Sequence, residues 1–227
     1  MAWREKPPLG KEEMKRQKDL KRDFASALSK IETRKICHSK GKSGGSSGKK
    51  TKGDYMKKAQ VHFDRGNRYK DNGQFEEAIA EYLKALKINP YLAEAHNNLG
   101  ILYKNKGQYW AAVEEFQKAI EINPDLDEAY DNLGIVYGIL GMFDKSIKQL
   151  QKAIDLGYID AQTDFNLALS YMKKGLIDEA IEEEYKKALE IDPNFAEAHY
   201  NLSLLYNKKG NKDEALEELE EFMKLRG

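Results

Sequence analysis

Four recurring asparagines carry the side chains best suited to a binding chemistry. Asn98, Asn132 and Asn166 stand 34 residues apart, and Asn201 follows 35 residues later. A carboxamide offers both a hydrogen-bond donor and an acceptor, so it can pair with a peptide amide whatever side chain that peptide carries. The chemistry that this spacing favours is non-covalent recognition of a polypeptide.

Residues for covalent or metal chemistry are not gathered in the same way. His62, His96 and His199 fall at one position of the repeat described below, so we interpret them as packing residues. Cys37 and His38 are adjacent but have no further ligands nearby in the sequence, whereas a zinc site needs about four. We find no catalytic constellation, and we therefore expect no enzymatic activity, no metal and no cofactor.

The elements that must position the asparagines follow from an internal repeat of 34 residues. Tyr69, Tyr103, Tyr137 and Tyr171 keep this step. The step becomes 35 once, which we attribute to one residue inserted near 182–184. The predicted units are 59–92, 93–126, 127–160, 161–195 and 196–227.

Small and helix-ending residues predict that each unit is a hairpin of two helices. Gly100 and Gly134 fit a close crossing of the two helices, and Gly107 fits a left-handed turn after the first helix. The Asn-Pro pairs at 89–90 and 123–124 end the second helix. A single hairpin cannot bury its apolar side, so neighbours stack. The predicted fold is all-α, a right-handed α-solenoid of five hairpins.

The unit resembles the tetratricopeptide repeat. In the second unit the matching residues are His96, Leu99, Gly100, Tyr103, Ala112, Phe116, Ala119 and Pro124. The resemblance implies a protein-binding scaffold or adaptor that holds a peptide or helix in a concave groove lined by the first helices. The four asparagines resemble the asparagine ladder in the repeat arm of O-linked N-acetylglucosamine transferase. The alternative is that asparagine is simply the family's common residue at this position.

The resemblance also implies which other side chains line the groove. We expect specificity to come from a mixed set of polar and apolar residues. They are Asn67, Asn97, Lys104, Asp131, Phe63, Phe165 and Tyr200.

One ligand known for the family is disfavoured by the same comparison. The two-carboxylate clamp for the C-terminal tail of Hsp70 or Hsp90 uses two asparagines, two lysines and an arginine. Asn67 and Asn98 match, but Phe63 and Glu128 replace the lysines and Asn132 replaces the arginine. Such a tail is therefore an unlikely partner.

The chain has a basic N-terminal part and an acidic body. Residues 1–54 carry 16 Lys and Arg against 7 Asp and Glu, and the rest carries 22 against 31. We divide it into an arm (1–40) with a candidate amphipathic helix at 11–36, a Gly/Ser/Lys linker (41–54) and the repeat array (55–227).

Several functions of the arm stay open. It could bind nucleic acid or an acidic membrane surface while the repeats oligomerise the chain, which is our alternative for the protein as a whole. It could dock on the acidic body, or be a disordered tail. The last helix offers a further surface, because no capping helix follows Leu216, Leu219, Phe222 and Leu225, and this predicts possible self-association.

The composition of the chain indicates the cellular compartment to expect. There is one cysteine, and no apolar run approaches the roughly 20 residues that span a bilayer. The first residues do not read as a signal peptide. We expect a soluble, cytoplasmic protein.

Overall fold

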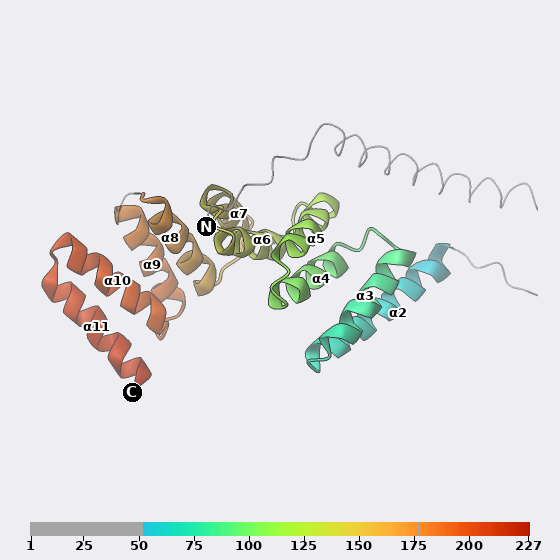
Figure 1. Cartoon of the computed structure of the whole chain (residues 1–227), viewed down its shortest axis with the longest axis horizontal. Helices are drawn as coiled ribbons and strands as arrows, with labels where there is room; N and C mark the ends of the chain where they lie inside the picture. Colours follow the sequence, from blue (N-terminus) through green and yellow to red (C-terminus); the bar gives the residue numbers. More distant parts are fainter. Residues whose placement is uncertain (1–51, 177) are drawn as a thin grey trace, which may run out of the picture. The chain divides into compact units, whose positions relative to one another are not determined.

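The computed structural model describes residues 52–176 and 178–227, which form helices joined by short turns (Figure 1). Each hairpin consists of a first and a second helix. The pairs are α2 (Lys52–Asp71) with α3 (Phe75–Ile88), α4 (Ala93–Asn105) with α5 (Tyr109–Ile122), α6 (Asp127–Ile139) with α7 (Phe143–Asp155), α8 (Ala161–Lys174) with α9 (Asp178–Ile191), and α10 (Ala196–Lys209) with α11 (Lys212–Arg226).

The predictions for the N-terminal arm, its candidate helix at 11–36, and Cys37 with His38 lie outside the described residues. The linker was expected to extend to residue 54, but α2 already begins at Lys52. The first helix is therefore longer than the repeat motif alone predicts, because residues ahead of position 59 continue the same helix.

The turns form where the glycines predict them. Gly107 has a φ of 71°, in the left-handed region that a β-carbon disfavours, and the equivalent glycines of the other hairpins have values from 72° to 86°. The third unit lacks the Pro that follows the other second helices, and there Gly157, with a φ of 95°, follows the end of α7. Local backbone chemistry thus sets the hairpin lengths.

The two helices of a hairpin approach most closely at the small residues. A β-carbon built on Gly100 would lie 2.7 Å from Cε1 of Phe116 on the second helix, and one on Gly134 would lie 2.7 Å from Cγ of Leu150. Ala168 holds this place in hairpin 4 and is fully buried. The prediction that glycine permits the close crossing is confirmed.

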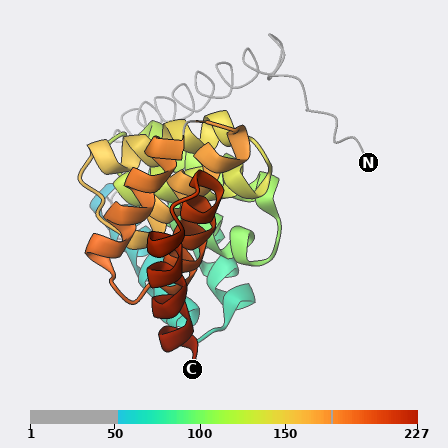
Figure 2. The ribbon, with the colours of Figure 1, turned by 90° about the vertical axis from the view of Figure 1, so that its left-hand side faces the viewer.

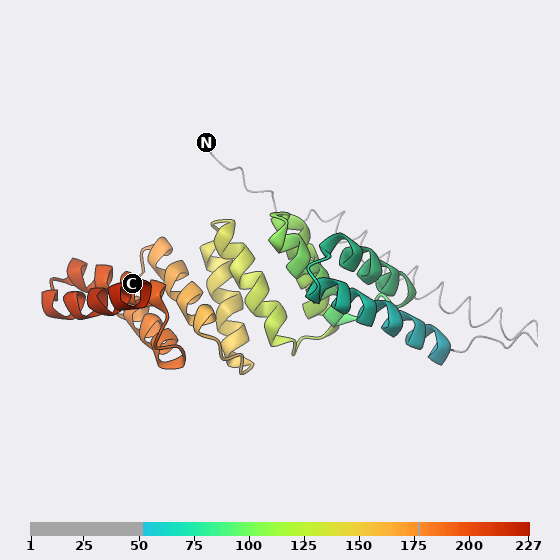
Figure 3. The same cartoon turned by 90° about the horizontal axis from the view of Figure 1, so that it is seen from below.

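Successive hairpins contact one another in chain order, as Figures 1 and 3 show for α2 to α11. Figure 2 looks along this row from the side of α11. First helices also contact the first helices of neighbouring hairpins, as α4 does α6 and α6 does α8. The apolar cores are shared between hairpins; one joins Phe165 and Tyr185 of hairpin 4 to Leu202 and Tyr206 of hairpin 5. The first helices α4, α6 and α8 therefore lie next to one another.

The extra residue of the fourth unit lies earlier than predicted. In the other hairpins the second helix begins two residues after the left-handed glycine, whereas α9 begins three residues after Gly175. Ile181, 2% exposed, takes the place that small residues such as Ala112 hold elsewhere. The insertion thus precedes Ile181 and is not at 182–184.

The last helix, α11, is only partly open. Leu216 is 58% exposed, whereas Leu219 and Phe222 are half-buried. The ring of Phe222 packs on Tyr200 with 5.1 Å between centroids. Two of the four residues predicted to be uncovered therefore face the preceding helix.

Candidate functional site

The asparagines of hairpins 1 and 2 form a closed network on the first helices. Asn98 donates a hydrogen bond to Oδ1 of Asn67 at 2.9 Å, and the hydroxyl of Tyr82 donates to the same oxygen at 2.7 Å. Burial raises the pKa of Tyr82 to about 12, so the hydroxyl stays a donor. Oδ1 of Asn67 therefore accepts both hydrogen bonds.

The asparagine of hairpin 3 is also engaged within the chain. Nζ of Lys104 donates to Oδ1 of Asn132 at 2.7 Å, and Nδ2 of Asn132 donates to the carbonyl of Glu128 at 3.0 Å. Asn132 is 6% exposed. Burial lowers the pKa of Lys104, against the opposing charges of Asp131 and Glu128. Both ends of this carboxamide are therefore already used.

The remaining two asparagines, Asn166 and Asn201, make fewer or longer side-chain hydrogen bonds to the described residues. Oδ1 of Asn166 accepts only a long hydrogen bond, 3.3 Å, from Gln162. Asn201 is half-buried and makes no side-chain hydrogen bond to the described residues. It lines a pocket of about 250 Å³ together with Met172, Leu176, Leu204 and other residues of hairpins 4 and 5.

One residue that lines this pocket, Tyr185, lacks the hydrogen bond that its equivalent in hairpin 1 makes. Tyr185 in hairpin 4 is equivalent to Tyr82, but Leu169 stands where hairpin 1 has Asn67. Tyr185 is fully buried, and its hydroxyl has no hydrogen-bond partner among the described residues. Hairpins 4 and 5 thus lack the carboxamide that closes the network in hairpins 1 and 2.

Three residues expected in the groove are buried instead. Asn97, Asp131 and Phe165 are 2%, 5% and 8% exposed. They stand one residue before the asparagines, about 100° around the helix, and this turn directs them toward neighbouring helices. Oδ1 of Asp131 accepts from Thr163 of hairpin 4 at 2.8 Å, and burial raises the pKa of Asp131 to about 6. We assign these three residues to packing.

The two other aromatic residues expected there are nearer the surface. Phe63 is half-buried against Tyr82, with 5.8 Å between ring centroids. Tyr200 is 42% exposed and stands next to Asn201. Its ring packs on Phe222 of α11, and Tyr200 is not one of the residues that line the pocket.

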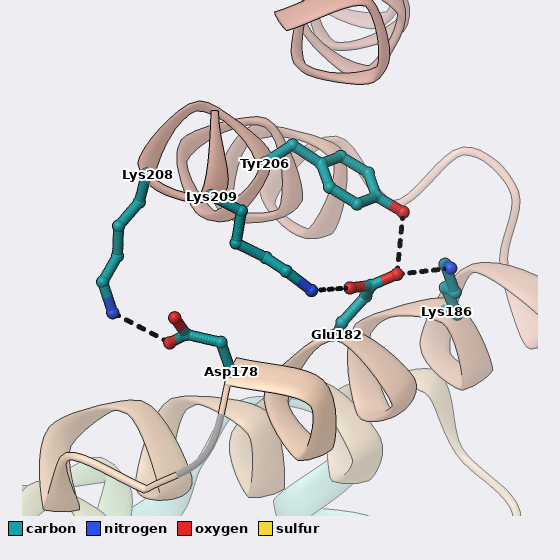
Figure 4. A network of polar contacts seen from close by, with 6 residues as sticks. All are labelled: Asp178, Glu182, Lys186, Tyr206, Lys208 and Lys209. Atoms are coloured by element: carbon teal, nitrogen blue, oxygen red, sulfur yellow. Dashed lines mark hydrogen bonds and ion pairs between the residues drawn. The ribbon is translucent and has the colours of Figure 1, made fainter. Parts of the chain in front are cut away.

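A polar network fixes the edge of this pocket (Figure 4). Nζ of Lys208 donates to Asp178 at 2.8 Å, and both residues line the pocket. Beside them Glu182 accepts from Lys186 at 2.6 Å and Lys209 at 2.7 Å, and these hydrogen bonds lower the pKa of Glu182 to about 2. The hydrogen bonds from Lys208 and Lys209 join α10 to α9 at this edge of the pocket.

The histidines pack as predicted, and they also have polar partners that the sequence analysis missed. Nδ1 of His96 lies 2.6 Å from Oε2 of Glu115, and His62 and His199 contact glutamates in the same way. Each pair joins the first helix of a hairpin to the second. A constant separation of 19 residues between His and Glu was the available signal.

No group of three or more His, Cys, Asp or Glu side chains is placed to hold a metal ion in residues 52–176 and 178–227. Within the same ranges, no helix has the length and apolarity needed to cross a membrane.

Comparison with known proteins agrees with the fold. Models described as TPR repeat match residues 66–107 and 168–210, and models described as tetratricopeptide repeat match 93–126, 115–148 and 196–227. No match was found among proteins of curated function.

Several solved structures are similar. A crystal structure of MamA is 30% identical, with a TM-score of 0.65, over 71% of this chain and 94% of that one. YrrB, described as a TPR protein with an unusual peptide-binding site, is 26% identical, with a TM-score of 0.63, over 75% of this chain and 91% of its own. MamA from Desulfovibrio magneticus RS-1, at 24% identity and a TM-score of 0.67, covers 74% of this chain and 95% of its own and supports the fold alone. The chain belongs to the tetratricopeptide repeat family.

Proposed function

We propose that this chain is a non-enzymatic adaptor that binds a peptide or helical segment of a partner protein on the asparagine-bearing face of its first helices. The repeat fold is consistent with protein–protein interaction, and the similar protein YrrB is described as having a peptide-binding site. The observation that carries the proposal is Asn201, which has no partner within the described residues and borders a pocket.

Apolar side chains beside Asn201 define what the pocket would accept. Met172, Leu176 and Leu204 are 39%, 37% and 49% exposed. A pocket of about 250 Å³ has room for an apolar side chain of a ligand. The carboxamide of Asn201 would then pair with the peptide backbone beside that side chain. The proposed ligand is a segment with an apolar anchor, held by hairpins 4 and 5.

The other asparagines contribute unequally in this proposal. Asn166 has one weak hydrogen bond to give up, so it would extend the contact toward hairpin 3. Asn132 would have to break a hydrogen bond at each end of its carboxamide before it could bind a ligand, and Asn98 would have to break the one that its Nδ2 donates to Asn67 before both ends could bind. The ladder is therefore proposed to act mainly at its C-terminal end.

The test uses peptides selected from a displayed library of random 12-residue sequences against the immobilised full chain. Affinities of selected peptides are then measured for the wild type and for the double variant Asn166→Ala, Asn201→Ala. Loss of about 1–2 kcal/mol of hydrogen bonding predicts roughly tenfold weaker binding. Stability should change little, because neither side chain makes a short hydrogen bond to the residues that the structure describes.

The matched control is Asn207→Ala, an exposed asparagine near the end of α10. It should bind the selected peptides as the wild type does. Leu204→Glu should abolish binding by placing a charge in the pocket. Equal affinity for the wild type and the double variant, together with retained binding by Leu204→Glu, would contradict the proposed site.

A further inference from the structure

The three His–Glu pairs indicate which chemical groups suit the histidine position of the repeat. In hairpin 2, Nδ1 of His96 faces Glu115 at 2.6 Å and Nε2 faces the carbonyl of Pro90 at 3.2 Å. In hairpin 5, His199 faces Glu218 and the carbonyl of Pro193 in the same way. A carbonyl oxygen can only accept a hydrogen bond, and a carboxylate accepts as well. The position therefore suits a cation that donates in two directions.

Hairpin 4 has a carboxylate at this position. Asp164 replaces the histidine, and Glu184 is the equivalent of Glu115 after the one-residue insertion. Asp164 is 7% exposed, and a side-chain hydrogen bond with Glu184 is among the contacts that raise its pKa. Oε2 of Glu184 is buried without a partner there, while Oε1 accepts from Lys187 at 3.1 Å. When both carboxyls are ionised, two acceptors lie close together without a donor between them.

A pocket of about 330 Å³ opens at this pair, between α7, α8 and α9. Asp164 and Glu184 line it, with Asp155 and Glu190 adding negative charge and Lys187 the one positive charge among its lining residues. Tyr158 also lines it and stands six residues before Asp164, as Pro90 stands before His96. The pocket is therefore acidic as well as short of donors.

The rim of the pocket is apolar. Ile154, Ile159 and Ile191 line it and are 36%, 80% and 42% exposed. A long side chain with a charged head can lay its methylene stem on such a rim while the head reaches acceptors below. An arginine fits best, because its planar guanidinium donates to two carboxylates from one group.

We propose that this pocket binds an arginine side chain, whose guanidinium takes the place between Asp164 and Glu184 that the imidazole ring occupies in hairpins 1, 2 and 5. The site lies between two second helices and the first helix α8, and none of its lining residues belongs to the peptide pocket beside Asn201. Its failure would leave the proposed function untouched. The arginine could come from a partner protein or from the basic residues 1–51 of the chain itself.

The test uses the full chain with N-acetyl-L-arginine methylamide as the probe and N-acetyl-L-citrulline methylamide as its neutral isostere. Binding is followed by NMR titration at pH 7.5. The arginine probe should bind at least tenfold more tightly than the citrulline probe. Asp164→Asn and Glu184→Gln should each weaken arginine binding about tenfold, whereas Asp213→Asn, on the exposed side of α11, should not.

The pH dependence adds an independent readout. Burial and the nearby charges of Glu184 and Asp160 raise the pKa of Asp164 to about 6, against the opposing effect of Lys187. The carboxyl is therefore charged at pH 7.5 and neutral at pH 5, and arginine binding should weaken on acidification. This loss should be smaller in Asp164→Asn, which cannot titrate at that position.

The source of the arginine is tested by a variant in which all four arginines of residues 1–51, namely Arg4, Arg16, Arg22 and Arg34, are replaced by glutamine. If residues 1–51 fill the pocket, the probe should bind more tightly to this variant than to the wild type. Unchanged probe affinity assigns the site to a partner's arginine. Equal binding of the arginine and citrulline probes, or no binding to either the wild type or the arm variant, would overturn the proposal.

Discussion

Hairpins 1 and 2 and hairpins 4 and 5 use the same repeat positions but treat their polar groups differently. Near the N-terminal end of the array, Asn67, Asn98 and Tyr82 satisfy one another, and His96 is held by Glu115. In hairpins 4 and 5 the equivalent Asn201 and Tyr185 have no partner among the described residues.

The acidic pair of hairpin 4 follows the same trend, because Asp164 faces Glu184 where other hairpins pair His with Glu. Unsatisfied buried polar groups destabilise a fold, so a place where they recur is a place where binding can compensate. Oδ1 of Asn97 in hairpin 2 is also buried without a partner among the described residues, but the C-terminal part of the array combines such groups with pockets, and the proposed function therefore assigns binding to it. Each prediction below changes equivalent residues in the two regions.

The largest difference is expected at the His–Glu position. His96→Ala should lower the free energy of unfolding by about 3 kcal/mol, because it leaves a buried carboxylate with only Lys118 as a partner. Asp164→Ala should cost little, since it removes one of two carboxyls that repel each other when both are ionised. Urea unfolding followed by circular dichroism measures both. Similar losses of unfolding free energy in the two variants would contradict this difference between hairpins 2 and 4.

A smaller difference is expected where the helices of a hairpin cross. Gly100→Ala should cost about 2 kcal/mol, because its β-carbon would lie 2.7 Å from Phe116. Hairpin 4 already holds Ala168 at this place, so Ala168→Gly should cost only about 1 kcal/mol, from chain flexibility. The same unfolding assay applies. A neutral Gly100→Ala would mean that the helices of hairpin 2 can separate freely.

The smallest difference is expected at the two tyrosine hydroxyls. Tyr82→Phe removes a 2.7 Å hydrogen bond to Asn67 and should cost about 1 kcal/mol. Tyr185→Phe removes a hydroxyl without a partner and should leave stability unchanged or raised. Differential scanning calorimetry measures the stability of both variants. A loss of stability in Tyr185→Phe as large as that in Tyr82→Phe would contradict the difference between the two hydroxyls.

The sequence predicts the backbone well because its signals are local. The turn at Gly107 needs a residue in the left-handed conformation, and glycine adopts it without steric cost. Pro124 likewise ends a helix whatever packs against it. The insertion was misplaced because Ala180 fits the 34-residue step, and only packing shows that Ile181 takes that place.

The candidate site was harder to predict because its state depends on neighbouring hairpins. Asn98 and Asn201 are equivalent in sequence, but Asn98 meets Asn67 while Asn201 meets a leucine-lined pocket. Asn97 and Asp131 stand one residue before two of the asparagines and are buried. A repeat position therefore indicates a direction on the helix but not whether a side chain is free to bind.

A reciprocal exchange tests the central claim most directly. Thermal unfolding of the full chain at pH 7.5 is compared for the wild type, Asp164→His and His96→Asp. The account predicts that Asp164→His raises the melting temperature, because an imidazole fills the missing donor position beside Glu184. His96→Asp should lower it by about 6–12 °C, as expected for a loss of roughly 3 kcal/mol in a chain of this size. A lower melting temperature for Asp164→His would contradict the claim that hairpin 4 lacks a donor which hairpins 1, 2 and 5 supply themselves.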